Sequence, residues 1–131
     1  MNSIFMGKKS FIGDISKWNV AKVTTMNRMF MSATSFNIDL SKWDVSSVIN
    51  MNGMFWSAAS FDGDISHFNV GRVTDMSAQS MGAKAFNGDI SKWDTRNVRD
   101  MHNMFWGATS FNRDISYCEL WLQGRSTNCE L

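Results

Sequence analysis

Hydrophobic and polar positions follow one another along this chain with a 25-residue period. The same residue types recur in register, without insertion or deletion, over most of the chain. A fixed period of this length is typical of a repeat protein, in which each unit buries its apolar face against its neighbours. The clearest column consists of Phe11, Phe36, Phe61, Phe86 and Phe111.

Further columns in the same register supply the rest of a candidate core. They are aliphatic (Ile15, Leu40, Ile65, Ile90, Ile115), aromatic (Trp18, Trp43, Phe68, Trp93), methionine (Met26, Met51, Met76, Met101) and alanine (Ala33, Ala58, Ala83, Ala108). Nearly every position that can face a core is therefore filled in the same way in each unit, as a stack of repeats requires.

Two local elements are predicted within each unit. Met26, Met29 and Phe30 have the i, i+3, i+4 spacing of a helix face. Thr24 offers an N-cap hydroxyl, so a short helical turn is expected there. From Ile15 to Val20, apolar and polar side chains alternate as in a short strand. The predicted fold is an α/β solenoid, a leucine-rich-repeat-like stack of about five coils, each a short parallel strand plus a short helical turn.

The chain is predicted to form one domain, residues 1–131, which is within the usual size range. Residues 1–10 are a partial first coil, and residues 11–116 contain the repeats. Residues 117–131 match no repeat and are expected to form a C-terminal cap or tail.

The two cysteines of the protein, Cys118 and Cys129, both lie in this tail. They can form one disulfide or remain free thiols, and a single pair does not define the compartment. Their spacing is not that of a zinc site. Leu120, Trp121 and Leu122 are the residues expected to cover the open end of the stack.

Some ten columns together carry a family resemblance that spans about residues 1–116. The units FIGDISKWNVAKVTTMNRMFMSATSF and FNGDISKWDTRNVRDMHNMFWGATSF are examples. They resemble the 25-residue repeat of BspA-like leucine-rich-repeat surface proteins, which also recurs in mycoplasma lipoproteins and in algal and protist proteins. The resemblance implies a repeat scaffold at the cell surface that takes part in adhesion or partner binding, and it brings no catalytic residues.

An aspartate column is the first candidate for chemistry: Asp14, Asp39, Asp64, Asp89 and Asp114. Stacked carboxylates repel one another, so other interactions must offset the repulsion. In the structural interpretation, each carboxylate accepts backbone N–H groups of its own turn and the column is a ladder of such turns. In the functional one, calcium is held between adjacent coils, because carboxylate oxygens are its ligands.

A second column, three residues further on, is mostly basic: Lys17, Lys42, His67 and Lys92. These cations can simply neutralise the acidic column as exposed pairs. Alternatively they form a basic stripe that binds an acidic partner surface, since repeat proteins bind through aligned columns of one face.

Tryptophan and methionine alternate at one position of the units. Trp56 and Trp106 stand where other units have Met6, Met31 and Met81. The column either belongs to the core or forms an exposed apolar row for a protein partner or a neighbouring copy.

One unit departs from the pattern. Gln79 and Ser80 replace the methionine and phenylalanine found elsewhere, and an empty cavity there would be costly. The local backbone is expected to rearrange, or a side chain such as Met81 to fill the space. Sequence drift explains the change, and entry of a ligand or a partner's residue is the alternative.

Composition excludes several functions. The net charge of +1 gives no bulk attraction to nucleic acid or membrane, and no apolar run is long enough for a membrane span. No phosphate loop, catalytic triad or metal cluster is visible, so neither an enzyme nor a cofactor is expected.

Two main function classes remain. The first is a scaffold for protein–protein interaction or adhesion, and the second is a structural accessory subunit that stabilises a larger assembly. Another protein or assembly is the expected partner. Calcium binding, and ice binding by a serine ladder (Ser16, Ser41, Ser66, Ser91, Ser116), are less favoured. The resemblance suggests the cell surface or the extracellular space, although no signal peptide is visible in this sequence.

Overall fold

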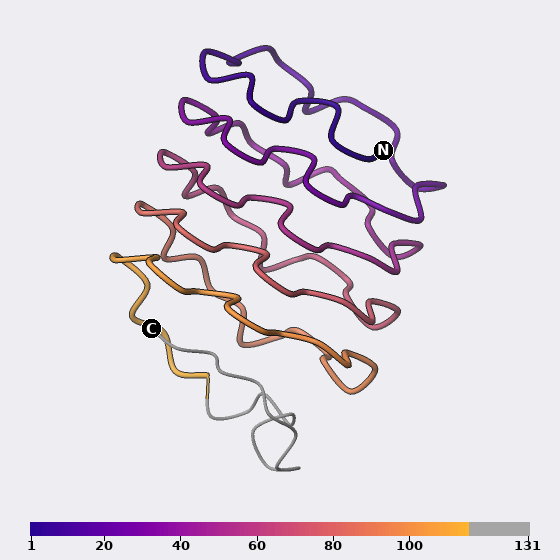
Figure 1. Ribbon diagram of the computed structural model, residues 1–131. Helices are drawn as coiled ribbons and strands as arrows, with labels where there is room; N and C mark the ends of the chain where they lie inside the picture. Colours follow the sequence, from indigo (N-terminus) through magenta and orange to yellow (C-terminus); the bar gives the residue numbers. More distant parts are fainter. Residues whose placement is uncertain (116–131) are drawn as a thin grey trace.

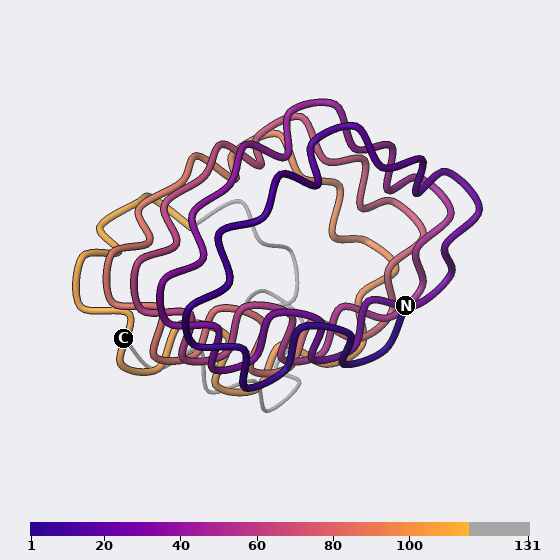
Figure 2. The ribbon, with the colours of Figure 1, turned by 90° about the horizontal axis from the view of Figure 1, so that it is seen from above.

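The structure is a computed structural model of the chain, and it describes residues 1–115. The chain winds in successive circuits that lie one above another (Figure 1). Seen along the stack, the circuits superpose in one elongated outline (Figure 2). We call each circuit a coil and number the positions within it from one. The coils are residues 1–25, 26–50, 51–75, 76–100 and, in its described part, 101–115.

The regular elements predicted from the sequence are not found. Residues 1–115 contain no helix and no strand longer than a single residue. Their regular β contacts are isolated parallel bridges that join Thr25 to Asn50, Asn50 to Asp75 and Asp75 to Asp100. The prediction of an α/β, leucine-rich-repeat-like solenoid is therefore wrong, because neither the helical turn nor the short strand forms.

Consecutive tight turns replace the predicted helical turn. Arg28 and Ser32 have positive φ angles of 52° and 58°, outside the right-handed helical region. The amide of Phe30 donates to the Met54 carbonyl of the next coil at 2.8 Å, whereas the amide of Met29 closes a local turn. A helix needs its amides to bond four residues back within the segment. Here alternate amides bond the neighbouring coil, so helical bonding is lost.

Two further turns replace the predicted strand. Trp18 N–H donates to Ile15 O at 3.0 Å, and Val23 N–H donates to Val20 O at 2.8 Å. The same pairs recur in the next three coils. The apolar residues at these positions meet the core because each turn brings its first and last residue to the same side, and not because the chain is extended.

Backbone hydrogen bonds join adjacent coils in both directions. Phe5 N–H donates to Met29 O at 2.9 Å, and the equivalent amide in coil 2 donates to coil 3 in the same way. In the opposite direction, Ile49 N–H donates to Thr24 O at 2.8 Å. Both kinds of bond recur from coil to coil through the stack. Each coil thus satisfies part of the backbone of the coils above and below it.

Phenylalanine rings form a double stack along the core. Phe30 and Phe36 of coil 2 lie face to face, with ring centroids 3.8 Å apart. Phe30 also stacks on Phe55 of coil 3 at 5.7 Å, and Phe36 stacks on Phe61 at 5.6 Å. Most residues of the predicted core columns are buried, with Phe36, Phe61 and Phe86 at 0% exposure, but Trp18 is 39% exposed, so its predicted place in the core is wrong. Offset and parallel rings of this kind add to the stability that area burial provides.

Coil 4 keeps the register despite its altered residues. Gln79 O accepts the amide of Phe55 at 2.8 Å, and Ser80 N–H donates to Met104 O at 3.0 Å. Met81 is partly exposed. The expected rearrangement of the backbone is therefore wrong, whereas the alternative, that a side chain such as Met81 fills the space, stays a prediction.

The tail predicted from the sequence lies outside the described residues, as do Ser116, Cys118 and Cys129. The assignment of residues 117–131 as a cap therefore stays a prediction, as does the single-domain boundary. No helix able to cross a membrane occurs in residues 1–115.

Replacement of Phe61 by alanine is expected to lower the free energy of unfolding by about 3–5 kcal/mol, because it removes a fully buried ring from the middle of the stack. Urea denaturation measures this loss. Phe11→Ala is the matched control, since Phe11 occupies the same position in the half-buried first coil and should cost clearly less. Equal losses would contradict the role assigned to the continuous stack.

Candidate functional site

Position six of every coil carries a large apolar side chain that the core does not enclose. Met6 is 48% exposed and Trp106 is 51% exposed. The three members between them are partly exposed. The sequence left open whether this position belongs to the core or forms an exposed apolar row. The observed exposure does not match a position inside the core. We call it the Met/Trp column: Met6, Met31, Trp56, Met81 and Trp106.

The backbone holds the Met/Trp column in a fixed arrangement. Ser57 N–H donates to Met81 O at 2.7 Å, and Gly82 N–H donates to Trp106 O at 2.7 Å. The carbonyls of Met31, Trp56, Met81 and Trp106 each accept an amide of the preceding coil in this way. The residue that follows has a positive φ in every coil, which favours glycine and requires a sharp turn. These residues are Gly7, Ser32, Ser57, Gly82 and Gly107.

Trp56 is less exposed than Trp106 and lies close to Gly53 of its own coil. A Cβ atom added to Gly53 would lie 3.5 Å from Trp56 Cε3 and 3.3 Å from Arg28 Cγ. The indole and the arginine stem thus both lie close to the place where a larger residue at 53 would put its Cβ atom. In coil 5 the same position holds Asn103.

The basic column lies on the surface, eleven positions after the Met/Trp column. Lys17, Lys42, His67 and Lys92 are all exposed. A shallow hollow of about 280 Å³ borders Lys17 and Lys42, and Trp18 and Asp44 also line it. Within residues 1–115, Arg96 and Asp94 form an ion pair at 2.8 Å, whereas the lysines of the basic column form none within 4 Å with Asp14, Asp39, Asp64 or Asp89.

His67 has a structural contact that the lysines lack. The indole Nε1–H of Trp43 donates to Ile15 O at 3.0 Å, and that of Trp93 donates to Ile65 O at 3.1 Å. Coil 3 has Phe68 at the tryptophan position and cannot make this bond. There His67 Nε2 lies 3.2 Å from the equivalent carbonyl, Leu40 O. The histidine therefore replaces the bond that the missing indole would supply.

The aspartate column closes local turns. Asp14, Asp39, Asp64 and Asp89 each accept the backbone N–H of the serine two residues later, at 2.8 to 2.9 Å. The carboxylates are exposed, and Asp114 is exposed as well. This arrangement is the Asx-type turn of the structural interpretation.

The same turns lower the pKa of these aspartates. The Ser41 backbone N–H is the main cause of the lowered pKa of Asp39, and the Ser16 hydroxyl is the main cause for Asp14. Both contacts favour the charged form. Lys17 and Lys42 lower the same pKa values by smaller amounts.

Metal and ice binding gain no supporting contact. Residues 1–115 contain no group of three or more His, Cys, Asp or Glu side chains that could hold a metal ion. In the serine column, Ser41 Oγ donates to Asp39 Oδ2 at 3.0 Å, so this hydroxyl serves the local turn.

Polar ladders between coils are a feature that was not predicted from the sequence. Asn27 Nδ2 donates to Asn52 Oδ1 at 2.9 Å, and Asn87 Oδ1 accepts Asn112 N–H at 3.1 Å. The signal was present in the sequence, since the 25-residue spacing also relates Asn2, Asn27 and Asn52, and likewise Asn87 and Asn112.

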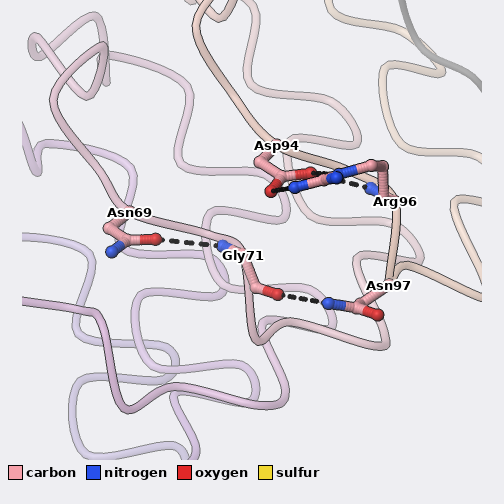
Figure 3. A network of polar contacts seen from close by, with 5 residues as sticks. All are labelled: Asn69, Gly71, Asp94, Arg96 and Asn97. Atoms are coloured by element: carbon pink, nitrogen blue, oxygen red, sulfur yellow. Dashed lines mark hydrogen bonds and ion pairs between the residues drawn. The ribbon is translucent and has the colours of Figure 1, made fainter.

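A polar network joins coils 3 and 4 at their exposed edge (Figure 3). Asp94 accepts two bonds from the Arg96 guanidinium, at 2.8 and 2.9 Å, and one from the Arg96 backbone N–H at 3.3 Å, and these bonds lower its pKa to about 2. Asn97 Nδ2 donates to Gly71 O at 2.7 Å, and Gly71 N–H donates to Asn69 Oδ1 at 3.2 Å. Each polar group serves a turn or the neighbouring coil, so the network is structural.

A family model matches nearly the whole chain. Its description is "Mycoplasma protein of unknown function, DUF285", and it matches residues 1–83 and again residues 48–128. Comparisons with curated proteins and with solved structures returned no match.

His67→Lys is expected to destabilise the protein by about 1 kcal/mol, because the Leu40 carbonyl loses its partner. Adding Phe68→Trp should restore the loss, since coil 3 then has the Lys-Trp pair of the other coils. A double-mutant cycle in urea measures the coupling. Lys92→His is the control and should be neutral, because Trp93 already makes the bond. Additive effects of the two substitutions would contradict the idea that His67 replaces the hydrogen bond of the missing indole.

The aspartate column should also determine acid stability. A folded-state pKa below the unfolded value gives stability that is present above about pH 4 and is lost as pH falls through the folded pKa. Asparagine in place of Asp39, Asp64 and Asp89 keeps the acceptor oxygen but cannot titrate. The triple variant should therefore lose less stability than the wild type between about pH 4 and pH 2. Glu at the same positions is the control, because it keeps the charge but is too long for the turn. An unchanged pH dependence in the Asn variant contradicts the assignment.

Proposed function

This chain belongs to the family described as Mycoplasma protein of unknown function, DUF285, and we propose that it is a non-enzymatic interaction module that binds another protein through the Met/Trp column. Its unit is the 25-residue repeat of the BspA-like surface proteins. On this proposal the protein acts in adhesion or partner binding at the cell surface.

The exposed Met/Trp column is the observation that carries the proposal. Large apolar side chains stand at the same place on all five coils, where neither coil neighbours nor the core cover them fully. Aligned apolar side chains of this kind are typical of protein-binding surfaces. Tryptophan is enriched among the residues that contribute most to binding, and methionine adapts to partners of different shape.

The surroundings of the column suit a closely fitting partner. Positions three and seven beside it hold small residues in several coils, including Gly53, Ala78, Gly82 and Gly107. A partner backbone can approach such positions closely, so Trp56 and Trp106 would fit between partner side chains. The column is also ordered before binding, because backbone hydrogen bonds of 2.7 Å fix its carbonyls.

The polar groups favour binding over catalysis. Asp14, Asp39, Asp64 and Asp89 are each engaged with a serine of the same coil. An active site needs several polar groups that converge on one concave place, whereas this chain repeats one arrangement along a wall.

A structural subunit of a larger assembly is the second candidate, and the first coil supports it. Ile12 is 71% exposed and Trp18 is 39% exposed, whereas Trp43 in coil 2 is 2% exposed. A sizing experiment on the isolated chain separates the two functions. An interaction module should remain monomeric, and a subunit with an open apolar end should self-associate.

A photo-crosslinking amino acid that replaces Met31 or Met81 should identify the partner in the native cell. The same amino acid in place of Lys42 is the control, because it lies outside the Met/Trp column. Binding of the purified partner is then measured by calorimetry. Trp56→Ser with Trp106→Ser should weaken binding by about 2 kcal/mol or more, because both indoles would lie in the interface.

Lys42→Glu with Lys92→Glu is the control, and it should change the affinity little. Circular dichroism should show that both variants remain folded, since all four side chains are at least partly exposed. A loss caused by the lysine variant alone would overturn the proposal in favour of the basic column.

A further inference from the structure

Coil 4 lacks the aromatic ring that its neighbours place in the core. The other coils have phenylalanine at position five, whereas coil 4 has Ser80. At position four it has Gln79, where coils 2, 3 and 5 have methionine. Both side chains are 0% exposed, so water outside the protein does not reach them.

The neighbouring ring has not moved into the vacated place. Phe86 lies 6.0 Å from Phe61, 5.8 Å from Phe111 and 6.4 Å from Phe105. The equivalent distances for Phe36 in coil 2 are 6.2, 5.6 and 6.3 Å. Phe86 therefore keeps the standard position although it lacks the ring that stacks on its equivalents at 3.8 to 4.0 Å.

The backbone has not closed the space either. The hydrogen bonds of residues 79 and 80 to coils 3 and 5 are 2.8 and 3.0 Å long, close to those of the other coils. Met81 is partly exposed, unlike the fully buried Gln79 and Ser80. A hydroxymethyl group thus stands where a benzyl group stands in the neighbouring coils.

The same place contains a buried hydrogen-bond donor without a partner. Ser80 Oγ–H donates to Gln79 Oε1 at 3.1 Å, so the amide lies beside the missing ring. Gln79 Nε2 is buried and has no hydrogen-bond partner. Nearly all buried polar groups in proteins are paired, and an unpaired one indicates a ligand or an ordered water.

We propose that coil 4 contains an internal binding site for a small aromatic molecule with one hydrogen-bonding oxygen, about the size of phenol. Its ring takes the place of the missing phenylalanine ring against Phe86, and its oxygen accepts Gln79 Nε2–H. Apolar walls with one or two placed polar groups are typical of small-molecule sites. Rings of this kind stack favourably with phenylalanine.

Thermal unfolding of the full chain with increasing phenol or benzene tests the site, because a ligand that binds the folded state raises Tm. Phenol should raise Tm in a saturable manner, with at least tenfold higher affinity than benzene. Ser80→Phe restores the ring of the other coils and should abolish the response to both. Gln79→Met keeps the space but removes the amide, so benzene should then bind at least as well as phenol. Both variants carry residues that other coils carry at the same positions and should fold.

Nuclear Overhauser contacts between phenol protons and the Phe86 ring would place the ligand. An equal response of wild type and Ser80→Phe would show binding elsewhere and overturn the proposal. No response in wild type would show that water fills the space, and it would overturn the proposal too. Preference of Gln79→Met for phenol would refute the role of the amide.

Discussion

The match between successive coils is the constraint on which the rest of this structure depends. An amide in one coil has to meet a carbonyl of the next coil, while each phenylalanine ring has to lie on the equivalent ring of that coil. Both contacts need the same vertical spacing. A single inserted residue would displace both at once, which explains why the repeats contain no insertion.

This constraint divides the side chains of each coil into three groups. Side chains turned inward form the phenylalanine stack and the aliphatic and methionine columns. Polar side chains along the wall, such as Asp39 and Asn52, bond local turns or the next coil. Only side chains turned outward, above all the Met/Trp column, are free to vary without breaking the stack. An interaction surface is the function that such a wall can most readily provide.

The two departures from the repeat behave differently. In coil 3 the loss of an indole is compensated, because His67 reaches the carbonyl that the indole would bind. In coil 4 the loss of a ring is not compensated, and Gln79 Nε2 is left unpaired. A hydrogen bond can be supplied from the neighbouring residue. A missing ring can be replaced only by a group of similar size, because the backbone hydrogen bonds between coils keep the surrounding coils at a fixed spacing.

The sequence by itself determined the 25-residue register and most of the core columns, since these follow from residue type at a fixed spacing. For the aspartates it offered turn closure as one of two interpretations, and the hydrogen bonds of the structure favour it. The helical turn predicted from the sequence was wrong, because consecutive tight turns can bury Met26, Met29 and Phe30 as fully as a short helix can. Which one forms depends on whether an amide bonds its own segment or the next coil, and that partner exists only in the assembled stack. The tertiary structure alone likewise decided the exposure of the Met/Trp column and the exchange at His67. Both depend on what an adjacent coil covers or offers, and no spacing within one unit contains that information.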